Sequence, residues 1–151
     1  MNTSYSTQPL HPNDRADWQP LFEGYAAFYE VPVSKAIIDR VWNWLQEPSH
    51  PVEGLLARDS KGVAQGLVHF RACPRPLGGC YIGFVDDMFV SPYARGTGVA
   101  DAMFDALAEI AACRAWPEIR WVTQHFNDRA RRFYDRYSSG PSDFIMYRWN
   151  Q

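Results

Sequence analysis

The sequence has no surplus of positive charge, no long apolar run and few cysteines. Its 15 lysines and arginines are balanced by 17 aspartates and glutamates, which gives a net charge of −2. Because a nucleic-acid-binding domain usually carries a basic surplus, we expect no nucleic-acid partner. The apolar runs are too short to cross a membrane, and the first residues contain no apolar segment of the signal-peptide kind. We therefore expect a cytoplasmic protein with no membrane partner.

Patterns typical of metal sites and disulfide frameworks are also missing. The cysteines are odd in number and lack the spacing of metal ligands: Cys73, Cys80 and Cys113. We expect them to be reduced thiols. The histidines show no metal-ligand spacing either, so we expect no bound metal. Two of them, His69 and His125, are expected to be ordinary residues within or at the end of a strand.

The sequence does contain ample material for a hydrophobic core. Hydrophobic residues make up 46% of its 151 residues and aromatic residues 15%, a composition and length typical of one globular domain. Residues 1–12 are rich in Ser, Thr, Asn and Pro and predict a flexible N-terminal arm. Residues 13–151 are predicted to form a single domain.

Apolar spacing, capping residues and prolines predict the order helix, helix, three strands, helix, strand, helix, strand. The helices are expected over residues 13–30, 34–47, 98–113 and 127–137. The strands are expected over residues 52–58, 63–71, 80–90, 119–124 and 144–149, with a loop at 73–79. This order predicts an α/β fold in which helices cover both faces of a mixed sheet.

A glycine loop, defined here as Arg95 to Ala100, joins a predicted strand to a predicted helix. Its sequence is Arg-Gly-Thr-Gly-Val-Ala. Glycine lets backbone N–H groups approach a ligand, and a helix start offers unpaired donors and partial positive charge. Together with the Arg95 guanidinium, these features predict a phosphate site. A turn that only needs glycine for its backbone angles is the alternative interpretation.

Two stretches of the chain resemble motifs of the GNAT superfamily of acetyl-CoA-dependent N-acetyltransferases. The first runs from Asp87 through the glycine loop, and the second is Asn127 to Tyr134, with the pattern Asn-x-x-Ala-x-x-Phe-Tyr. The resemblance implies an acyltransferase with acetyl-CoA as co-substrate. It also implies a GNAT-like fold, with a mostly antiparallel sheet in which the strand over 80–90 splays away from the next strand.

The resemblance also implies which residues hold acetyl-CoA. The strand end would bind the pantetheine arm, the glycine loop the pyrophosphate, and the last helix a further part of the cofactor. The implied residues are Met88, Phe89, Val90, Arg95, Gly96, Thr97, Gly98, Val99, Ala100, Asn127 and Ala130. Tyr134 would donate a proton to the departing CoA thiolate. Packing of its helix on the sheet is the alternative role for Tyr134.

The acceptor site is expected around Asp86 and Asp87. These residues begin a run, Asp-Asp-Met-Phe-Val, that resembles the polyamine/diamine acetyltransferase branch of the superfamily. Asp86 is the predicted general base and Asp87 a predicted acceptor-binding residue, on opposite faces of a strand. Ordinary strand-end charges are the alternative. Tyr29 and Glu30, at the end of the first helix, are further predicted acceptor-binding residues.

The predicted activity is transfer of an acetyl group to a primary amine, directly and through a tetrahedral intermediate. Acidic residues near the site favour a small cationic amine. A protein or peptide lysine acetyltransferase and a non-catalytic acyl-CoA sensor are the alternatives. Because the final strands look abbreviated, which would expose a sheet edge, we expect a homodimer in which the C-terminal region closes the sheet.

Overall fold

The computed structural model describes residues 4–151 and contains two compact units, one up to Trp121 and one from Val122 to Gln151. The first unit holds a five-stranded sheet in the order β1-β2-β3-β4-β5. Its strands are β1 (Ser6–Pro9), β2 (Val52–Arg58), β3 (Ala64–Arg75), β4 (Cys80–Val90) and β5 (Ile119–Trp121). All neighbouring pairs are antiparallel except β4 and β5, which are parallel. The predicted mixed sheet is confirmed.

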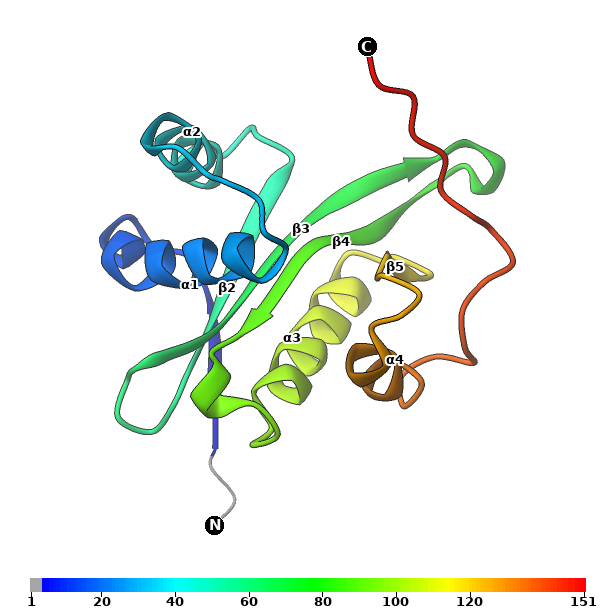
Figure 1. The fold of residues 1–151 in the computed structure, drawn as a ribbon. Coiled ribbons are helices and arrows are strands. Elements are labelled where there is room, and N and C mark those ends of the chain that lie inside the picture. The colour runs from blue at the N-terminus through cyan, green and yellow to red at the C-terminus, as the bar shows by residue number, and fades with distance from the viewer. Residues whose placement is uncertain (1–3) are drawn as a thin grey trace. The chain divides into compact units, whose positions relative to one another are not determined.

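Helices cover both faces of this sheet (Figure 1). One face carries α1 (Arg15–Phe28) and α2 (Lys35–Gln46), and the other carries α3 (Val99–Cys113). Adjacent strand residues separate accordingly: Leu67 packs with the α1 and α2 side chains, whereas Val68 packs with those of α3. Two buried clusters, one on each face, form the hydrophobic core of the first unit.

Local chemistry explains where α2 begins and where α1 ends. Ser34 caps α2, because its side chain accepts a hydrogen bond from the N–H of Ile37 at 3.3 Å. Helix α1 stops at Phe28, because Glu30 adopts a positive φ of 56° that a helix does not allow. Gly24 lets α1 approach the sheet closely, since a Cβ there would lie 2.9 Å from the ring of Phe89 on β4.

The N-terminal half departs from the sequence prediction at two places. Of the predicted arm, residues 1–3 lie outside the described residues, and β1 forms within the rest, along the edge of β2. Its pairing is anchored by Leu10, whose N–H donates to the carbonyl of Gly54 at 3.0 Å. The predicted loop over 73–79 is shorter, because β3 continues to Arg75 opposite Cys80. A two-stranded extension of the sheet results.

The second unit holds one helix, α4 (Asp128–Tyr134), and within residues 122–151 no strand is formed. The predicted strand over 144–149 is therefore wrong, and β5 ends at Trp121, not at Gln124. A strand needs a hydrogen-bonded neighbour, which residues 122–151 do not provide by themselves.

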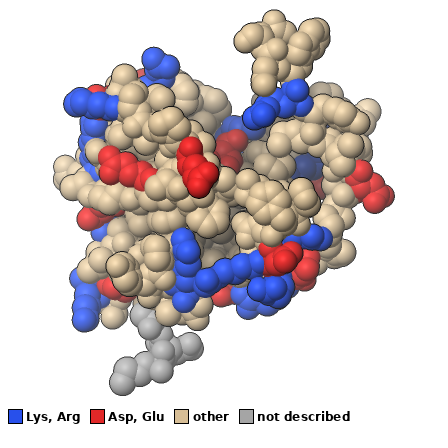
Figure 2. Space-filling model, viewed as in Figure 1, with Lys and Arg blue, Asp and Glu red and all other residues tan. Residues whose placement is uncertain are grey.

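The described part of the chain has mixed surface charge and free cysteines. Acidic and basic side chains are interspersed on the face seen in Figure 2. Cys73, Cys80 and Cys113 are free thiols. Among residues 4–151, no cluster of three potential metal ligands occurs, and no helix has the length and apolarity that crossing a membrane requires.

Candidate active site

Strands β4 and β5 are hydrogen-bonded to each other only as far as the middle of β4. Their pairing joins Gly83, Phe84 and Val85 to the three residues of β5 and goes no further. Strand β4 continues to Val90, still paired with β3 on its other side. Backbone groups of Met88 to Val90 therefore lie on a strand edge that β5 does not cover. Within the first unit, the pairing of β4 with β5 therefore ends before Asp86.

A β-bulge interrupts β4 at Asp86. His69 on β3 pairs with Asp87, and the next β3 residue, Phe70, pairs with Val85, so Asp86 is the extra residue. The extra residue interrupts the alternation of side chains between the two faces of the sheet. Asp86 binds the side chain of Arg71, whereas Asp87 binds that of His69, and these two β3 residues share one face of the sheet. The prediction that the two carboxylates face opposite ways is wrong: both lie on the α1/α2 face.

Asp86 is engaged by an arginine. Both of its carboxylate oxygens accept from Nε of Arg71, at 3.0 and 3.3 Å. This hydrogen bond raises the pKa of Arg71 above its usual value. The same guanidinium lies 4.8 Å from the centre of the Phe84 ring, which holds it on the sheet surface.

Asp87 is the outer member of two linked hydrogen bonds that run into the core. Its Oδ2 lies 2.8 Å from Nδ1 of His69, and Nε2 of His69 lies 2.9 Å from Nε1 of Trp18 on α1. His69 was expected to be an ordinary strand residue, and sequence reasoning missed this contact. Spacing along the chain carries no signal for it, because the three residues are brought together by strand pairing and by packing of α1.

Tyr29 and Asp87, two of the predicted acceptor-binding residues, lie close enough to interact. The pKa of Tyr29 is raised by burial and, to a smaller extent, by the negative charge of Asp87. Asp87 keeps 27% of its side chain exposed, so a ligand can reach it. Glu30, the next residue after Tyr29, is exposed in its left-handed conformation. The end of α1 thus lies beside the bulge.

The glycine loop follows the short helix η3 (Pro92–Ala94) and leads into α3. Gly96 and Gly98 have φ values of 80° and 102°, which side chains other than glycine rarely adopt. Space opens beside both, since a Cβ at either position would meet nothing within 4 Å among the described atoms. The first N–H groups of α3 have no acceptor within the helix. The N–H groups at the start of α3 are therefore candidate donors for a ligand.

Side chains of the glycine loop stabilise its conformation through hydrogen bonds and burial in the core. Oγ1 of Thr97 donates to the carbonyl of Ala94 at 2.6 Å and lies 2.6 Å from the hydroxyl of Tyr5. The Val99 side chain is buried in the core on the α3 face. Thr97 and Val99 thus hold the loop with their side chains, and the backbone N–H of Thr97 also donates to the carbonyl of Ala94 at 3.4 Å.

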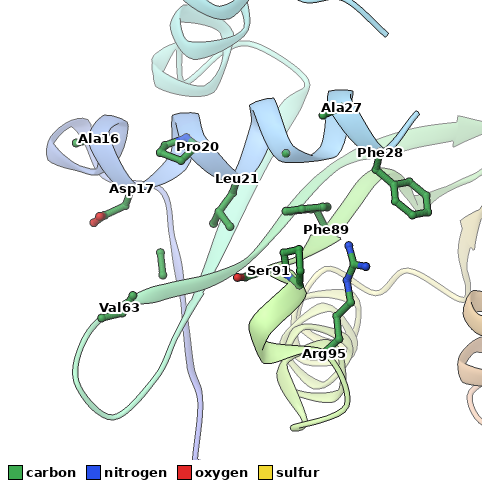
Figure 3. Close-up of a pocket in the computed structure, with 13 residues that line it drawn as sticks. Ala16, Asp17, Pro20, Leu21, Ala27, Phe28, Val63, Phe89, Ser91 and Arg95 are labelled. Carbon is green, nitrogen blue, oxygen red and sulfur yellow. The ribbon is translucent and has the colours of Figure 1, made fainter. Parts of the chain in front are cut away.

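Arg95 lies at one end of a pocket of about 610 Å³ between α1 and the end of β4 (Figure 3). Its Nε donates to the carbonyl of Val90 at 3.3 Å, and its guanidinium lies 5.8 Å from the ring centres of both Phe28 and Phe89. Side chains of α1 and of the β2–β3 turn complete a mostly apolar wall.

The remaining predicted site residues belong to the second unit. Asn127 caps α4, because its Oδ1 accepts from the N–H of Ala130 at 3.2 Å. Tyr134 is the last residue of α4 and is partly buried, with its ring centre 5.6 Å from that of Phe133. The carbonyl of Tyr134 accepts from the hydroxyl of Ser138 at 3.1 Å, which closes the helix end.

Comparisons with known proteins agree with this geometry. The family model described as acetyltransferase (GNAT) family matches residues 18–138. The D-amino-acid N-acetyltransferase HPA3 of Saccharomyces cerevisiae is 23% identical over 151 residues, which cover 99% of this chain and 93% of that protein. A ribosomal-protein-alanine N-acetyltransferase from Brucella melitensis has a similar structure, with a TM-score of 0.81, 27% identity and coverage of 98% and 99% of the two chains. The aminoglycoside 6'-N-acetyltransferase AAC(6')-Ih from Acinetobacter baumannii shares the fold at 14% identity, with a TM-score of 0.79 and coverage of 98% and 99%.

Proposed function

The chain belongs to the acetyltransferase (GNAT) family and is an acyltransferase, and we propose that it acetylates the primary amino group of a small cationic molecule. The observation that carries this acceptor class is the bulge in β4, which brings Asp86 and Asp87 onto one face of the sheet. A partly exposed carboxylate beside Tyr29 offers a charge-assisted hydrogen bond to an ammonium group.

The residues present fit acetyl-CoA, the co-substrate that this family uses. Open space borders Gly96 and Gly98, and backbone N–H groups of the glycine loop at the start of α3 would hold the pyrophosphate with Arg95. The uncovered edge of β4 from Met88 to Val90 would hold the pantetheine arm, and Asn127 and Ala130 a further part of the molecule. When bound, acetyl-CoA supplies the acetyl group as a reactive thioester.

The chain's own residues supply proton transfer. Tyr134 donates its phenolic proton to the leaving sulfur, and a carboxylate of β4 takes the proton that the acceptor nitrogen must lose. Asp86 is the base that the sequence predicted. Both carboxylates are partly exposed, but both oxygens of Asp86 accept from Arg71, whereas Asp87 is bound through one oxygen and interacts with Tyr29, which makes Asp87 the better placed of the two.

Replacing Gly98 by alanine tests the glycine loop as the phosphate site. A side chain at a φ of 102° is strained by about 1–3 kcal/mol, so we expect lower stability and weaker acetyl-CoA binding. Gly62, with a φ of 82° in the β2–β3 turn, is the matched control, because alanine there is also strained and also meets open space. Calorimetric titration with acetyl-CoA should detect weaker binding for Gly98→Ala alone. Equal losses in both variants would remove the loop from the binding site.

A second candidate acceptor is an amino acid. The Arg71 guanidinium shares the face of Asp87, so an acceptor with both an ammonium and a carboxylate group finds a partner for each. The relative HPA3 is named as a D-amino-acid N-acetyltransferase, which is consistent with this class.

A panel of acceptors separates these classes. Initial rates of CoA release should be compared for a diamine, an aminoglycoside, D- and L-amino acids and a peptide amine. The highest kcat/KM for the cationic small molecules supports the first proposal. A preference for amino acids that is lost in Arg71→Gln supports the second. Turnover of the peptide alone would contradict both and indicate a protein or peptide acetyltransferase.

A homodimer is also part of the proposed assembly. Strand β5 is the last strand of the sheet in the first unit. The C-terminal segment exposes between 73% and 88% of five large hydrophobic residues: Phe144, Ile145, Met146, Tyr147 and Trp149. Such a run marks an interaction surface. Size-exclusion chromatography with light scattering should give a dimer mass at micromolar concentration, and a monomer for a chain ending at residue 143. A monomeric full-length chain would contradict the dimer.

A further inference from the structure

Three side chains from three elements, two of them buried, are joined by hydrogen bonds beside the proposed acceptor face. Trp18 of α1 contacts His69 of β3 at 2.9 Å, and His69 contacts Asp87 of β4 at 2.8 Å. Trp18 is 0% exposed and His69 is 1% exposed, whereas Asp87 reaches the surface with 27% of its side chain exposed. These hydrogen bonds thus connect two buried residues to Asp87, the member of the three that a ligand can touch.

The direction of these hydrogen bonds fixes the proton on His69. The indole N–H of Trp18 can only donate, so Nε2 of His69 must accept and carries no proton. The single ring proton is therefore on Nδ1, and Nδ1 donates it to Oδ2 of Asp87. His69 has neither a free lone pair nor a spare proton, which excludes it as an acid or base while Trp18 is in place.

The surroundings of His69 make this arrangement rigid. Its ring lies 5.6 Å from the ring of Phe22 and 6.1 Å from that of Trp18, both in the buried cluster on the α1/α2 face. Buried polar groups lose much when a partner is removed, because water cannot replace it. Asp87 is consequently held through Oδ2 in one orientation, and Oδ1 is the oxygen that does not contact His69.

We propose that His69, held by Trp18, is the positioning residue of the acceptor site and orients Asp87 as the carboxylate that receives the amine, an inference that rests on the proposed function. The acceptor ammonium donates to Oδ1 of Asp87 and passes one proton to it. The nitrogen lone pair then forms the bond to the acetyl carbon and gives a tetrahedral intermediate. As this collapses, the carbon–sulfur bond breaks, the sulfur takes the proton of Tyr134, and the second nitrogen proton passes through solvent to the Tyr134 oxygen. Asp87 later releases the proton to solvent through its exposed side. His69 changes neither its charge nor its tautomer in this sequence.

The experiment compares substitutions of the buried members with conservative rescue. His69→Leu removes the donor to Asp87 at similar volume, and we expect kcat/KM for the amine to fall by about 10–100-fold, as for other residues that orient a ligand-binding group. KM for acetyl-CoA should stay close to that of the wild type. His69→Asn places an amide N–H where Nδ1 stood, and we expect it to recover most of the loss. Trp18→Phe should cause a smaller fall of the same kind, with Trp44→Phe, an exposed tryptophan on α2, as the control.

Two outcomes would overturn the positioning role. One is an unchanged amine kcat/KM in folded His69→Leu. The other is equal losses for amine and acetyl-CoA, without recovery in His69→Asn. If His69→Leu does not fold, nitrogen-15 NMR of the wild-type protein decides, since the proton must be found on Nδ1 and a proton on Nε2 contradicts the hydrogen-bond chain. A wild-type protein that acetylates no amine would refute the proposed function. The NMR result would still test the hydrogen bonds that join Trp18, His69 and Asp87.

Discussion

Tyr134→Phe should lower the turnover number by about 10²–10⁴-fold, the usual contribution of a positioned general acid. The substitution removes only the phenolic O–H and keeps the ring that packs beside Phe133. Without that proton the CoA sulfur must leave as a thiolate. Affinity for acetyl-CoA should change little, because the proton is needed only as the carbon–sulfur bond breaks. Steady-state kinetics at saturating amine, with calorimetry for acetyl-CoA, measure the two effects separately.

Tyr137→Phe is the matched control for this prediction. Tyr137 lies in the same unit, three residues beyond Tyr134, and is 40% exposed. Its ring also packs against Phe133, with the ring centres 5.1 Å apart, so the two variants disturb packing in similar ways. The control should turn over at nearly the wild-type rate. Wild-type turnover in Tyr134→Phe would remove Tyr134 as the acid and leave it a packing role.

Asp87→Asn should be the most damaging substitution in the acceptor site. An amide has the shape of the carboxylate but neither its charge nor its capacity to take the proton of an ammonium group. We expect kcat/KM for the amine to fall by about 10²-fold or more, in line with loss of a general base. Binding of acetyl-CoA should be retained, because the glycine loop that would hold its pyrophosphate is a separate element from the bulge.

Asp86→Asn provides the internal comparison for Asp87→Asn. Asp86 occupies the bulge position and both of its oxygens accept from Arg71, so its loss should mainly disturb the orientation of that arginine. We expect a clearly smaller effect on amine turnover. The reverse order, with Asp86→Asn the more damaging, would restore Asp86 as the base and contradict the assignment of Asp87.

The parts of the fold that were predictable from the sequence are those governed by local chemistry. Ser34 caps a helix and the glycines of the loop adopt positive φ, because these depend on a residue and its near neighbours. The order of the elements from α1 to α4 followed from apolar spacing in the same way. The two motifs then identified the family, which the family model confirms over residues 18–138.

The parts that were missed depend on contacts between distant segments. The bulge at Asp86 is a property of the β3–β4 register, and nothing in the run around it distinguishes a regular strand from a bulged one. His69 acquires its role from Trp18, 51 positions away in the chain. The dependence on distant contacts also explains why the strand over residues 6–9 was missed and the strand over residues 144–149 was wrongly predicted. Residues 6–9 pair with an edge that β2 provides, whereas residues 144–149 have the composition of a strand and no strand beside them within residues 122–151.

The measurement that tests the account most directly is the stoichiometry of acetyl transfer. Acetyl-CoA and a reactive amine from the panel are mixed with the enzyme, the released thiol is assayed, and the acetylated amine is measured by mass spectrometry. We predict one N-acetyl product for each CoA released, with release dependent on the amine and strongly reduced in Asp87→Asn. Tight binding of acetyl-CoA without product from any amine would contradict the account and indicate a non-catalytic acyl-CoA sensor.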